Sequence, residues 1–465
     1  MVGKTKNYLL FGRLLVLVMV VFAGTFVYSA ESADEMEAMR QEIRELKQMV
    51  RGLTKEVGGI REAKSQVSSQ QVQYQRELNE IRADVTKLNE SPMLDFADTL
   101  GRINFGGYGE IHANFNEGDG SDKMDFHRLV LYLGYDFADW IKFHSETELE
   151  HAFVKDTDTD TDGSSPNTNT SGGELSLEQA YVDFLFSDAF NIRAGRLLTP
   201  VGIINQRHEP TLFNGVERPN FSKRIIPSTW SSDGIGVFGN FNPSLSYEAY
   251  VVAGLDGDGF TSSGIRDGRI KSKQSLNDVA FTGRLDYRPW EDALADADQS
   301  LRLGVSGYFG GLDNSDGGGG NGKSGEIAMT SADFEYSISK FDFRGVIAQT
   351  NIDGASNLNS SSNVAEEMFG WYLESGYHFM PEEWKIGKLE DADAVVFVRY
   401  EEYDTQHKMP AGIAKDQSKN IEELTFGINF YLTSNFVVKA DYQIRKNASG
   451  SVMDDLFNIG LGWTF

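Results

Sequence analysis

The sequence predicts an all-β transmembrane barrel of 16 antiparallel strands, preceded by an α-helical coiled coil. Three observations support this fold class. From residue 103 to the last residue, apolar and polar side chains alternate, which is the pattern of strands that face an apolar medium on one side and water on the other. The connections between these expected strands alternate between tight turns and longer, polar loops. A repeat of apolar residues with a period of seven precedes the strands.

Composition limits the class of protein. The chain has 465 residues and no cysteine, which excludes a disulfide framework, a zinc–thiolate site and a lipidated N-terminal cysteine. The formal net charge is −26, and the acidic excess lies entirely in residues 91–465, because residues 1–90 hold 13 basic and 12 acidic residues. Nucleic acid is therefore excluded as a partner, since a phosphate backbone requires a basic surface.

Residues 1–30 have the organisation of a secretory signal peptide. Basic residues occur among the first thirteen positions, an apolar run covers 14–27, and a plausible cleavage site follows. The alternative is a retained membrane anchor, although the apolar run is short for a helix that spans a bilayer. The sequence thus predicts an exported protein.

Residues 31–91 are predicted to form a periplasmic coiled-coil stalk. Between 36 and 88, apolar residues recur at alternating spacings of three and four, and only Lys64 and Gln71 interrupt this series with polar side chains. A strict period of 3.5 requires a partner helix, whereas a lone amphipathic helix has a period of 3.6. The stalk would extend roughly 80 Å at about 1.5 Å per residue. The pattern indicates self-association and leaves open whether the stalk is a dimer or a trimer.

Residues 92–465 are predicted to form the barrel. Five connections are tight turns and two are longer, at 289–300 and 380–391, while the connections at the opposite ends of the strands are mostly long and polar. Short turns on one side and long loops on the other are typical of bacterial outer-membrane barrels, and an even strand count places both ends of the barrel on the short-turn side. A soluble β-sandwich, the alternative, has no reason to sort its loops in this way. A barrel of this size leaves an aqueous lumen.

Two histidines test this topology. His127 and His151 fall on the lipid-facing positions of their strands, where a polar side chain is costly at mid-bilayer. Both are expected near the extracellular ends of the strands, where interfacial polar groups are tolerated.

Several motifs resemble the phosphate-selective porin (O/P type) family of outer-membrane porins. The residues that carry this resemblance are Gly107-Tyr108-Gly109, the segments 177–184 and 192–196, Pro200-Val201-Gly202, Arg218-Pro219, the segment 225–230 and Gly234-Ile235-Gly236. The C-terminal Phe465 resembles the assembly signal at porin C-termini, and an N-terminal coil ahead of a barrel also looks like some sugar-specific porins. The resemblance implies a sixteen-stranded homotrimer in outer-membrane lipid.

The predicted lumen carries charges of both signs. Arg128, Arg193, Glu146 and Glu148 are among its inward-facing residues, and they either line the pore or form ordinary salt bridges of the wall. The segment 197–232, the third extracellular loop, is the candidate constriction. Its candidate pore residues are Arg207, Arg218, Lys223 and Arg224. If this loop folds into the lumen, its cations favour anions there, since rings of charged side chains govern selectivity; the alternative is a solvated external loop.

The sequence therefore predicts a porin for passive diffusion of small hydrophilic solutes, with a possible preference for phosphate or other small anions. One alternative is a structural tether that joins the outer membrane to the cell wall through the coiled coil. Another is a porin specific for sugars or dicarboxylates. No catalytic residue, metal or cofactor is expected, because no serine, histidine and acid set is evident and the acidic segment 156–162 lacks calcium-loop spacing.

Overall fold

The computed structural model describes residues 100–465, except 119, 152–173, 291–293, 295–296 and 359–362. Residues 97–465 form one compact unit. The predicted signal peptide at 1–30 and the predicted coiled-coil stalk at 31–91 lie outside the described residues.

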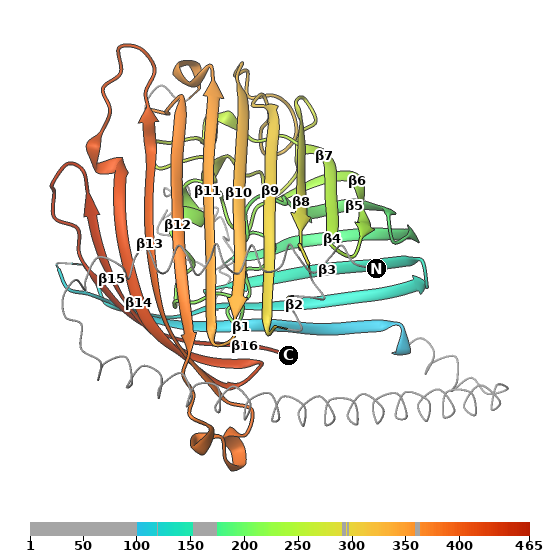
Figure 1. Cartoon of the computed structure of the whole chain (residues 1–465). Coiled ribbons are helices and arrows are strands. Elements are labelled where there is room, and N and C mark those ends of the chain that lie inside the picture. The colour runs from blue at the N-terminus through green and yellow to red at the C-terminus, as the bar shows by residue number, and fades with distance from the viewer. Residues whose placement is uncertain (1–99, 119, 152–173, 291–293, 295–296, 359–362) are drawn as a thin grey trace, which may run out of the picture. The chain divides into compact units, whose positions relative to one another are not determined.

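Sixteen antiparallel strands form a closed barrel, as the alternation of side chains predicts (Figure 1). Each strand pairs with its neighbours in the chain, and β1 pairs with β16. The strands are β1 (Ile103–Asn116), β2 (Lys123–Ala138), β3 (Ile141–Glu150), β4 (Glu174–Ser187), β5 (Phe190–Leu198), β6 (Ser231–Asn242), β7 (Leu245–Ala253), β8 (Val279–Tyr287), β9 (Gln299–Gly311), β10 (Glu326–Ile338), β11 (Phe341–Asp353), β12 (Glu367–His378), β13 (Asp393–Lys408), β14 (Asn420–Thr433), β15 (Phe436–Asn447) and β16 (Leu456–Thr464).

Glycines in β1 allow the barrel to close. The backbone of Gly107 exchanges two hydrogen bonds of 2.9 Å with that of Phe465, so the chain end is held against the first strand. A Cβ atom on Gly109 would lie 2.5 Å from Cζ2 of Trp463, and one on Gly107 would lie 2.9 Å from Cζ of Phe465. The Gly107-Tyr108-Gly109 motif therefore leaves room for the two aromatic rings of the C-terminus at the point where the sheet closes.

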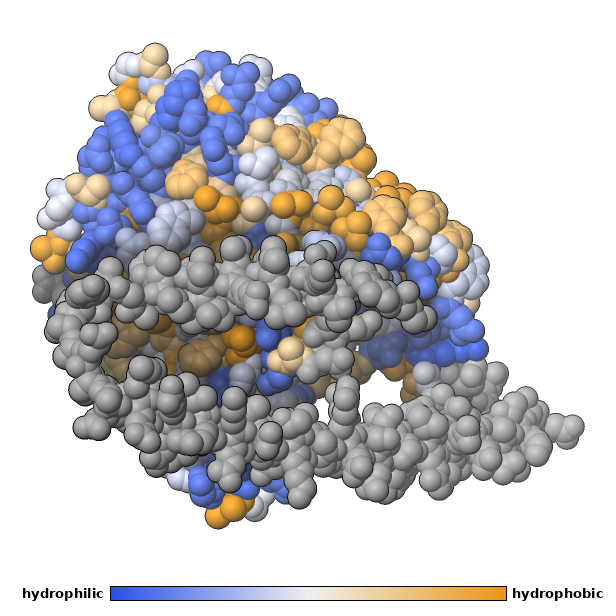
Figure 2. Space-filling view, viewed as in Figure 1, coloured by the Kyte–Doolittle hydropathy of each residue, from blue (hydrophilic) through white to orange (hydrophobic). Residues whose placement is uncertain are grey.

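The outer face of the barrel is apolar. Large side chains such as Phe105, Leu133, Val305 and Phe426 are exposed on it, and hydrophobic atoms gather over the strands in Figure 2. Near the tight turns, aromatic residues form contacts such as Trp140–Phe186, Phe241–Tyr247, Phe341–Tyr377 and Phe436–Trp463. An apolar band bordered by an aromatic girdle is the surface that a lipid bilayer requires.

The connections sort by length as predicted. The links after β2, β4, β6, β10 and β14 are two-residue turns, and those after β8 and β12 are longer. We call this side of the barrel the short-turn end and the opposite side the long-loop end. Among the described residues, the connections contain the α-helix α4 (Phe221–Arg224) and the short 3-10 helices η1 (Gly257–Gly259), η2 (Arg266–Gly268), η3 (Ala355–Asn357), η4 (Glu382–Trp384), η5 (Gly387–Leu389) and η6 (Gln417–Lys419). No helix within the described ranges is long and apolar enough to cross a membrane.

The predicted lipid-facing position of His127 is wrong, because a β-bulge interrupts the alternation. The β1–β2 register passes from Glu110↔Arg128 to Ile111↔Phe126 and leaves His127 without a partner. Phe126 faces outward, whereas the ring of His127 stacks on that of His112 at 4.6 Å and lines a lumen cavity. His151, which follows β3 with a φ of 56°, lines the same cavity and so does not face lipid either.

Candidate functional site in the barrel lumen

The connection between β5 and β6, residues 199–230, lies inside the barrel; we call it loop L3. Its hydrogen bonds reach inward-facing side chains on eleven strands, β1, β2 and β7 to β15. A solvated external loop could not make these contacts. The structure therefore places L3 in the lumen. Of the two hypotheses for this segment, the loop folded into the lumen is confirmed, and the solvated external loop is wrong.

Apolar packing holds L3 in place. Phe221 and Trp230 are fully buried, and their rings lie 5.6 Å from Tyr372 and 4.7 Å from Tyr308, both on the inner wall. On the other side of the lumen, a Cβ on Gly460 would lie 2.8 Å from Val216. L3 therefore packs directly against bare backbone of β16, which explains why this strand carries glycine at an inward position.

Charged wall residues satisfy the buried backbone of L3. Nζ of Lys439 donates to the carbonyls of Phe213 and Gly215 at 2.7 and 2.8 Å. The N–H of Phe221 donates to Glu401 at 2.7 Å, and the guanidinium of Arg284 donates to the carbonyl of Gly202 at 2.8 Å. A loop buried without such partners would leave costly unpaired polar groups. Many inward charges of the wall thus serve to seat L3.

Described residues of the wall and of L3 line two cavities in the lumen. The outer cavity, about 520 Å³, lies at the long-loop end, because Asn116, Lys123 and Leu456 at strand ends line it. The inner cavity, about 480 Å³, lies at the short-turn end, where Gln299 and Asp342 line it. The charged residues of the outer cavity are Lys123, Arg128, Arg218, Lys223, Arg266 and Arg445 against Glu110, Glu150 and Glu217. Those of the inner cavity are Arg207, Arg288, Arg302 and Arg344 against Glu335 and Asp342.

Four of the predicted pore residues are neutralised by ion pairs of the wall. Arg128 is buried, and its nitrogens lie 2.7 Å from Glu110, 2.7 Å from Glu148 and 3.4 Å from Glu150. The charges of Arg128 and Glu148, both predicted to line the pore, therefore offset each other within the wall. Arg193 of β5 forms a two-pronged pair with Asp183, at 2.7 and 2.9 Å, and its guanidinium lies 4.0 Å from the Tyr181 ring centroid. Arg207 of L3 pairs with Glu335 of β10.

The other predicted cations of L3 have no such partner. Arg218 lines the outer cavity and donates to the carbonyl of His208 at 2.9 Å, and Lys223 of α4 lines the same cavity. Within the described part of the chain, no carboxylate lies within ion-pair distance of either residue. Burial, and after it the positive charge of Arg266, lowers the pKa of Lys223. Arg224, also predicted, lies in α4 but lines neither cavity.

The prediction missed Arg266, which comes from the loop between β7 and β8. Its guanidinium donates to the carbonyl of Ser228 in L3 at 2.7 Å and lines the outer cavity, and no described carboxylate pairs with it. The run 266–273, with four basic residues in an otherwise acidic barrel, is the signal that could have identified it. Arg269 from the same run donates to the carbonyls of Ser228 and Thr229, so this loop fixes the end of L3.

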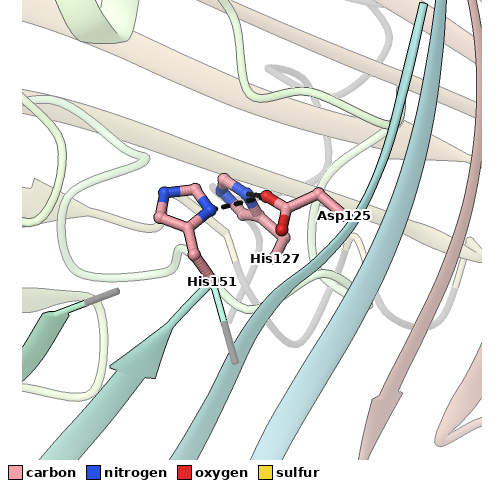
Figure 3. Close-up of side chains that lie close together, drawn as sticks. All are labelled: Asp125, His127 and His151. Carbon is pink, nitrogen blue, oxygen red and sulfur yellow. Dashed lines mark hydrogen bonds and ion pairs between the residues drawn. The ribbon is translucent and has the colours of Figure 1, made fainter. Parts of the chain in front are cut away.

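Histidines gather at the mouth of the outer cavity. One carboxylate oxygen of Asp125 lies 2.6 Å from Nδ1 of His151 and 3.2 Å from Nδ1 of His127 (Figure 3). The ring of His112, which stacks on that of His127, is held between Glu110 and Glu217, at 3.1 Å each. Although burial acts to raise the pKa of Glu217, its hydrogen bond to His112 and the charge of His112 hold this pKa well below its usual range. Glu217 is therefore a fixed anion of the site.

Comparisons with known proteins identify relatives of this chain. Residues 101–455 match the model of the family described as phosphate-selective porin O and P. A protein of Aquifex aeolicus (strain VF5), described as uncharacterized, is 33% identical over 383 residues, which cover 78% of this chain and 80% of that protein.

A search of solved structures gave matches of low sequence identity. The anion-selective porin from Comamonas acidovorans is 12% identical with a TM-score of 0.47, covering 78% of this chain and 99% of that one. The outer-membrane channel DcaP of Acinetobacter baumannii is 13% identical with a TM-score of 0.46, and the match covers 78% of this chain and 97% of DcaP. OmpF of Salmonella typhi, in complex with daunomycin, is 10% identical with a TM-score of 0.49, and the match covers 78% of this chain and 97% of OmpF.

Proposed function

The chain belongs to the phosphate-selective porin O and P family and is an outer-membrane porin, and we propose that it conducts small hydrophilic solutes passively with a preference for anions. The preference comes from charges at the surface of the outer cavity. Arg218, Lys223 and Arg266 line this cavity and have no carboxylate partner among the described residues. This single observation carries the proposal, because unpaired charges attract ions, whereas paired ones largely cancel.

The overall negative charge does not oppose this preference. The net charge of −26 belongs to the whole chain, and charges on solvated loops are screened beyond about 10 Å at 0.1 M salt. An ion inside the lumen responds mainly to the groups that line its path. Six basic residues face three glutamates in the outer cavity, and four arginines face two acids in the inner cavity. In the inner cavity, Arg207 pairs with Glu335, and Arg302 and Arg344 pair with acids of the wall, so their charges largely cancel. An anion that crosses the barrel therefore meets the unpaired cations Arg218, Lys223 and Arg266 in the outer cavity.

Small oxyanions such as inorganic phosphate are the solutes that these groups suit best. A guanidinium presents several N–H donors in a plane and binds two oxygens of one phosphate or carboxylate at once. Arg218 and Arg266 come from different loops and line one cavity, and Lys223 adds a third positive donor. Dicarboxylates would use the same groups, so they are the natural competitors in a test.

We further propose that the protein is a homotrimer in the outer membrane, with residues 31–91 as a periplasmic coiled coil. The heptad pattern of that segment supports self-association. By the usual topology of bacterial barrels, the short-turn end faces the periplasm, and the long-loop end, with the outer cavity, faces the exterior. A solute that enters the cell thus meets the outer cavity first.

Single-channel recording in planar bilayers tests the proposed function. The purified full chain in KCl should give stepwise conductance, and inorganic phosphate added on one side should reduce the chloride current because it occupies the cationic cavity. The same measurement with succinate at equal concentration shows whether a dicarboxylate reduces the chloride current more or less than phosphate does. Absence of any conductance would contradict the proposal and favour the tether. Conductance that is insensitive to both anions would contradict the anion preference alone.

A further inference from the structure

A second cluster of polar side chains lies where L3 meets the wall between β3 and β4. Its members are Glu146 of β3, Glu178 of β4 and His208 of L3, which are 1%, 6% and 2% exposed. Neither glutamate lines the two cavities described above. The pore function proposed above does not use this cluster.

The three side chains converge on one point at ion-pair distance, but without hydrogen bonds to one another. Nε2 of His208 lies 3.5 Å from Oε1 of Glu146 and 3.4 Å from Oε2 of Glu178, and all three atoms lie within 4.8 Å of each other. None of these three buried atoms makes a hydrogen bond to a described residue. Buried polar atoms almost always have a hydrogen-bond partner, so three such atoms without one at a single point indicate a missing ligand.

The spacing matches the edges of a metal coordination shell. Two ligands at about 2.0–2.2 Å from a tetrahedral zinc ion are separated by roughly 3.3–3.6 Å. The two nitrogen–oxygen distances of the cluster, 3.4 and 3.5 Å, fall in this range. Asp125, His127 and His151 at the mouth of the outer cavity, which we call the mouth cluster, differ from this arrangement. The separations of 2.6 and 3.2 Å between Asp125 and the two histidines are hydrogen-bond lengths.

Neighbouring groups orient the ligands. Nδ1 of His208 lies 2.9 Å from the carbonyl of Asn205, and a carbonyl only accepts, so this nitrogen carries a proton. In the neutral ring, the lone pair that a metal requires is therefore on Nε2, the atom that faces the two glutamates. The amide of Gln179 donates to the second oxygen of Glu146. Metal-binding histidines and carboxylates are typically held by such outer hydrogen bonds.

A β-bulge brings Glu178 into the cluster. The β3–β4 register passes from Glu146↔Gln179 to Thr147↔Leu177, which leaves Glu178 unpaired. Leu177 is exposed on the outer face, whereas Glu178 is buried on the inner side. Without the bulge, strict alternation would point this carboxylate into lipid. Bulges often re-aim a side chain at a functional site.

The local charge calls for a divalent cation. When the imidazole is neutral, as metal ligation requires, the two carboxylates give the cluster a charge of −2, and the nearby guanidinium of Arg128 is already shared among three other glutamates. We propose that Glu146, Glu178 and His208 bind one divalent transition-metal ion, with zinc as the best match, and that water completes the shell. One nitrogen and two carboxylate oxygens are a ligand set that zinc accepts, with the fourth position open.

The metal would fasten L3 to the wall. His208 is the loop's contribution, and its carbonyl accepts the hydrogen bond of Arg218 at 2.9 Å. A metal bound to the imidazole of His208 would therefore also fix the His208 carbonyl, which accepts the hydrogen bond of Arg218. This consequence rests on the proposed function, whereas metal binding itself does not.

Metal analysis of the purified full chain tests the site. After equilibration with ZnCl2 and gel filtration in metal-free buffer, elemental analysis should find one zinc per folded chain, and zinc-edge X-ray absorption should show imidazole scattering with nitrogen and oxygen ligands at about 2.0–2.1 Å. Glu178→Gln should abolish binding, and His151→Gln, the matched change in the mouth cluster, should leave it intact.

A milder variant keeps the test independent of folding defects. Gln179→Ala removes only an outer hydrogen bond and should weaken zinc affinity by about 10- to 100-fold, measured by competition with a chelating dye. Failure of the folded wild type to retain zinc would overturn the site even if the channel conducts. Zinc retained by Glu178→Gln and lost in His151→Gln would also overturn it and would assign the metal to the mouth cluster. Neither result depends on the selectivity of the pore.

Discussion

Substitution of Arg218 by glutamine should weaken the anion preference without closing the channel. Arg218 lines the outer cavity, and its side chain makes one hydrogen bond, to the carbonyl of His208, and lies 6.0 Å from the Phe213 ring centroid. Glutamine can still donate to a carbonyl, so the main change is the loss of one positive charge. The size of the effect follows from the distance at which an ion passes that charge.

An order-of-magnitude estimate gives the expected shift. At about 5 Å, one unit charge is worth ~0.8 kcal/mol in water, and screening at 0.1 M salt reduces this to ~0.5 kcal/mol. An anion loses this attraction and a cation loses the same repulsion. The two effects change the anion-to-cation permeability ratio by ~1 kcal/mol, or about fivefold. A lower dielectric constant inside the lumen would enlarge the effect, so fivefold is a lower bound.

Reversal potentials under a KCl gradient measure this ratio directly. Lys388→Gln is the matched control, because it removes one positive charge from an exposed residue at the short-turn end that lines neither cavity. The control should keep the wild-type ratio. If Arg218→Gln and Lys388→Gln give the same ratio as the wild type, the unpaired cations of L3 do not set the selectivity, and the reasoning fails.

Three further predictions concern the lysine of the pore, the closure of the barrel and the seating of L3. Because the pKa of Lys223 lies below that of an ordinary lysine, its charge is lost at a lower pH; the anion preference should therefore fall as pH rises toward 10, and Lys223→Arg should remove this fall in reversal-potential measurements. Gly109→Val should lower the free energy of unfolding by about 1–3 kcal/mol in urea titrations, because the new side chain overlaps the Trp463 ring. Arg399→Met should cost about 3–5 kcal/mol in the same assay, because it leaves Glu401 buried without its cation and leaves Glu374 with Arg344 alone.

A specific result would contradict each of these three predictions. A constant permeability ratio between pH 7 and 10 would mean that Lys223 contributes nothing to selectivity. Gly101→Val, where no atom lies within 4 Å of the added Cβ, controls for valine at a glycine position, and equal stability of the two valine variants would refute the closure argument. A stability of Arg399→Met equal to that of Lys388→Met would show that the buried pairs do not seat L3.

The barrel itself could be predicted from the sequence because the features that indicate it depend only on residues close together in the chain. Strict alternation follows from a strand between lipid and water, and loop sorting follows from a barrel with two unlike ends. The five tight turns occur where expected, and the Gly107-Tyr108-Gly109 motif lies at the seam between β1 and β16. These features need only the spacing of residues along the chain.

The site could be predicted only in part, because bulges and long-range packing are not visible in the spacing. A single extra residue in β2 turns His127 into the lumen, and another in β4 does the same for Glu178. Alternation alone assigns both side chains to the lipid face. A bulge needs the register of two strands, which the sequence of one strand does not contain.

The position of L3 was left open by the sequence for a related reason. Its cations are unusual in an acidic chain, but the residues that could pair with them lie far away in sequence. Arg207 pairs with Glu335, which is 128 residues away, whereas Arg218 has no carboxylate partner among the described residues. Which of the predicted pore residues are neutralised and which remain charged is decided by these distant contacts.

The sign of the reversal potential of the wild-type channel tests the central claim most directly. In a planar bilayer with KCl at unequal concentrations, the unpaired cations Arg218, Lys223 and Arg266 predict an anion-selective potential in spite of the net charge of −26. A cation-selective potential would contradict the account and would mean that the acidic groups of the chain govern the pore.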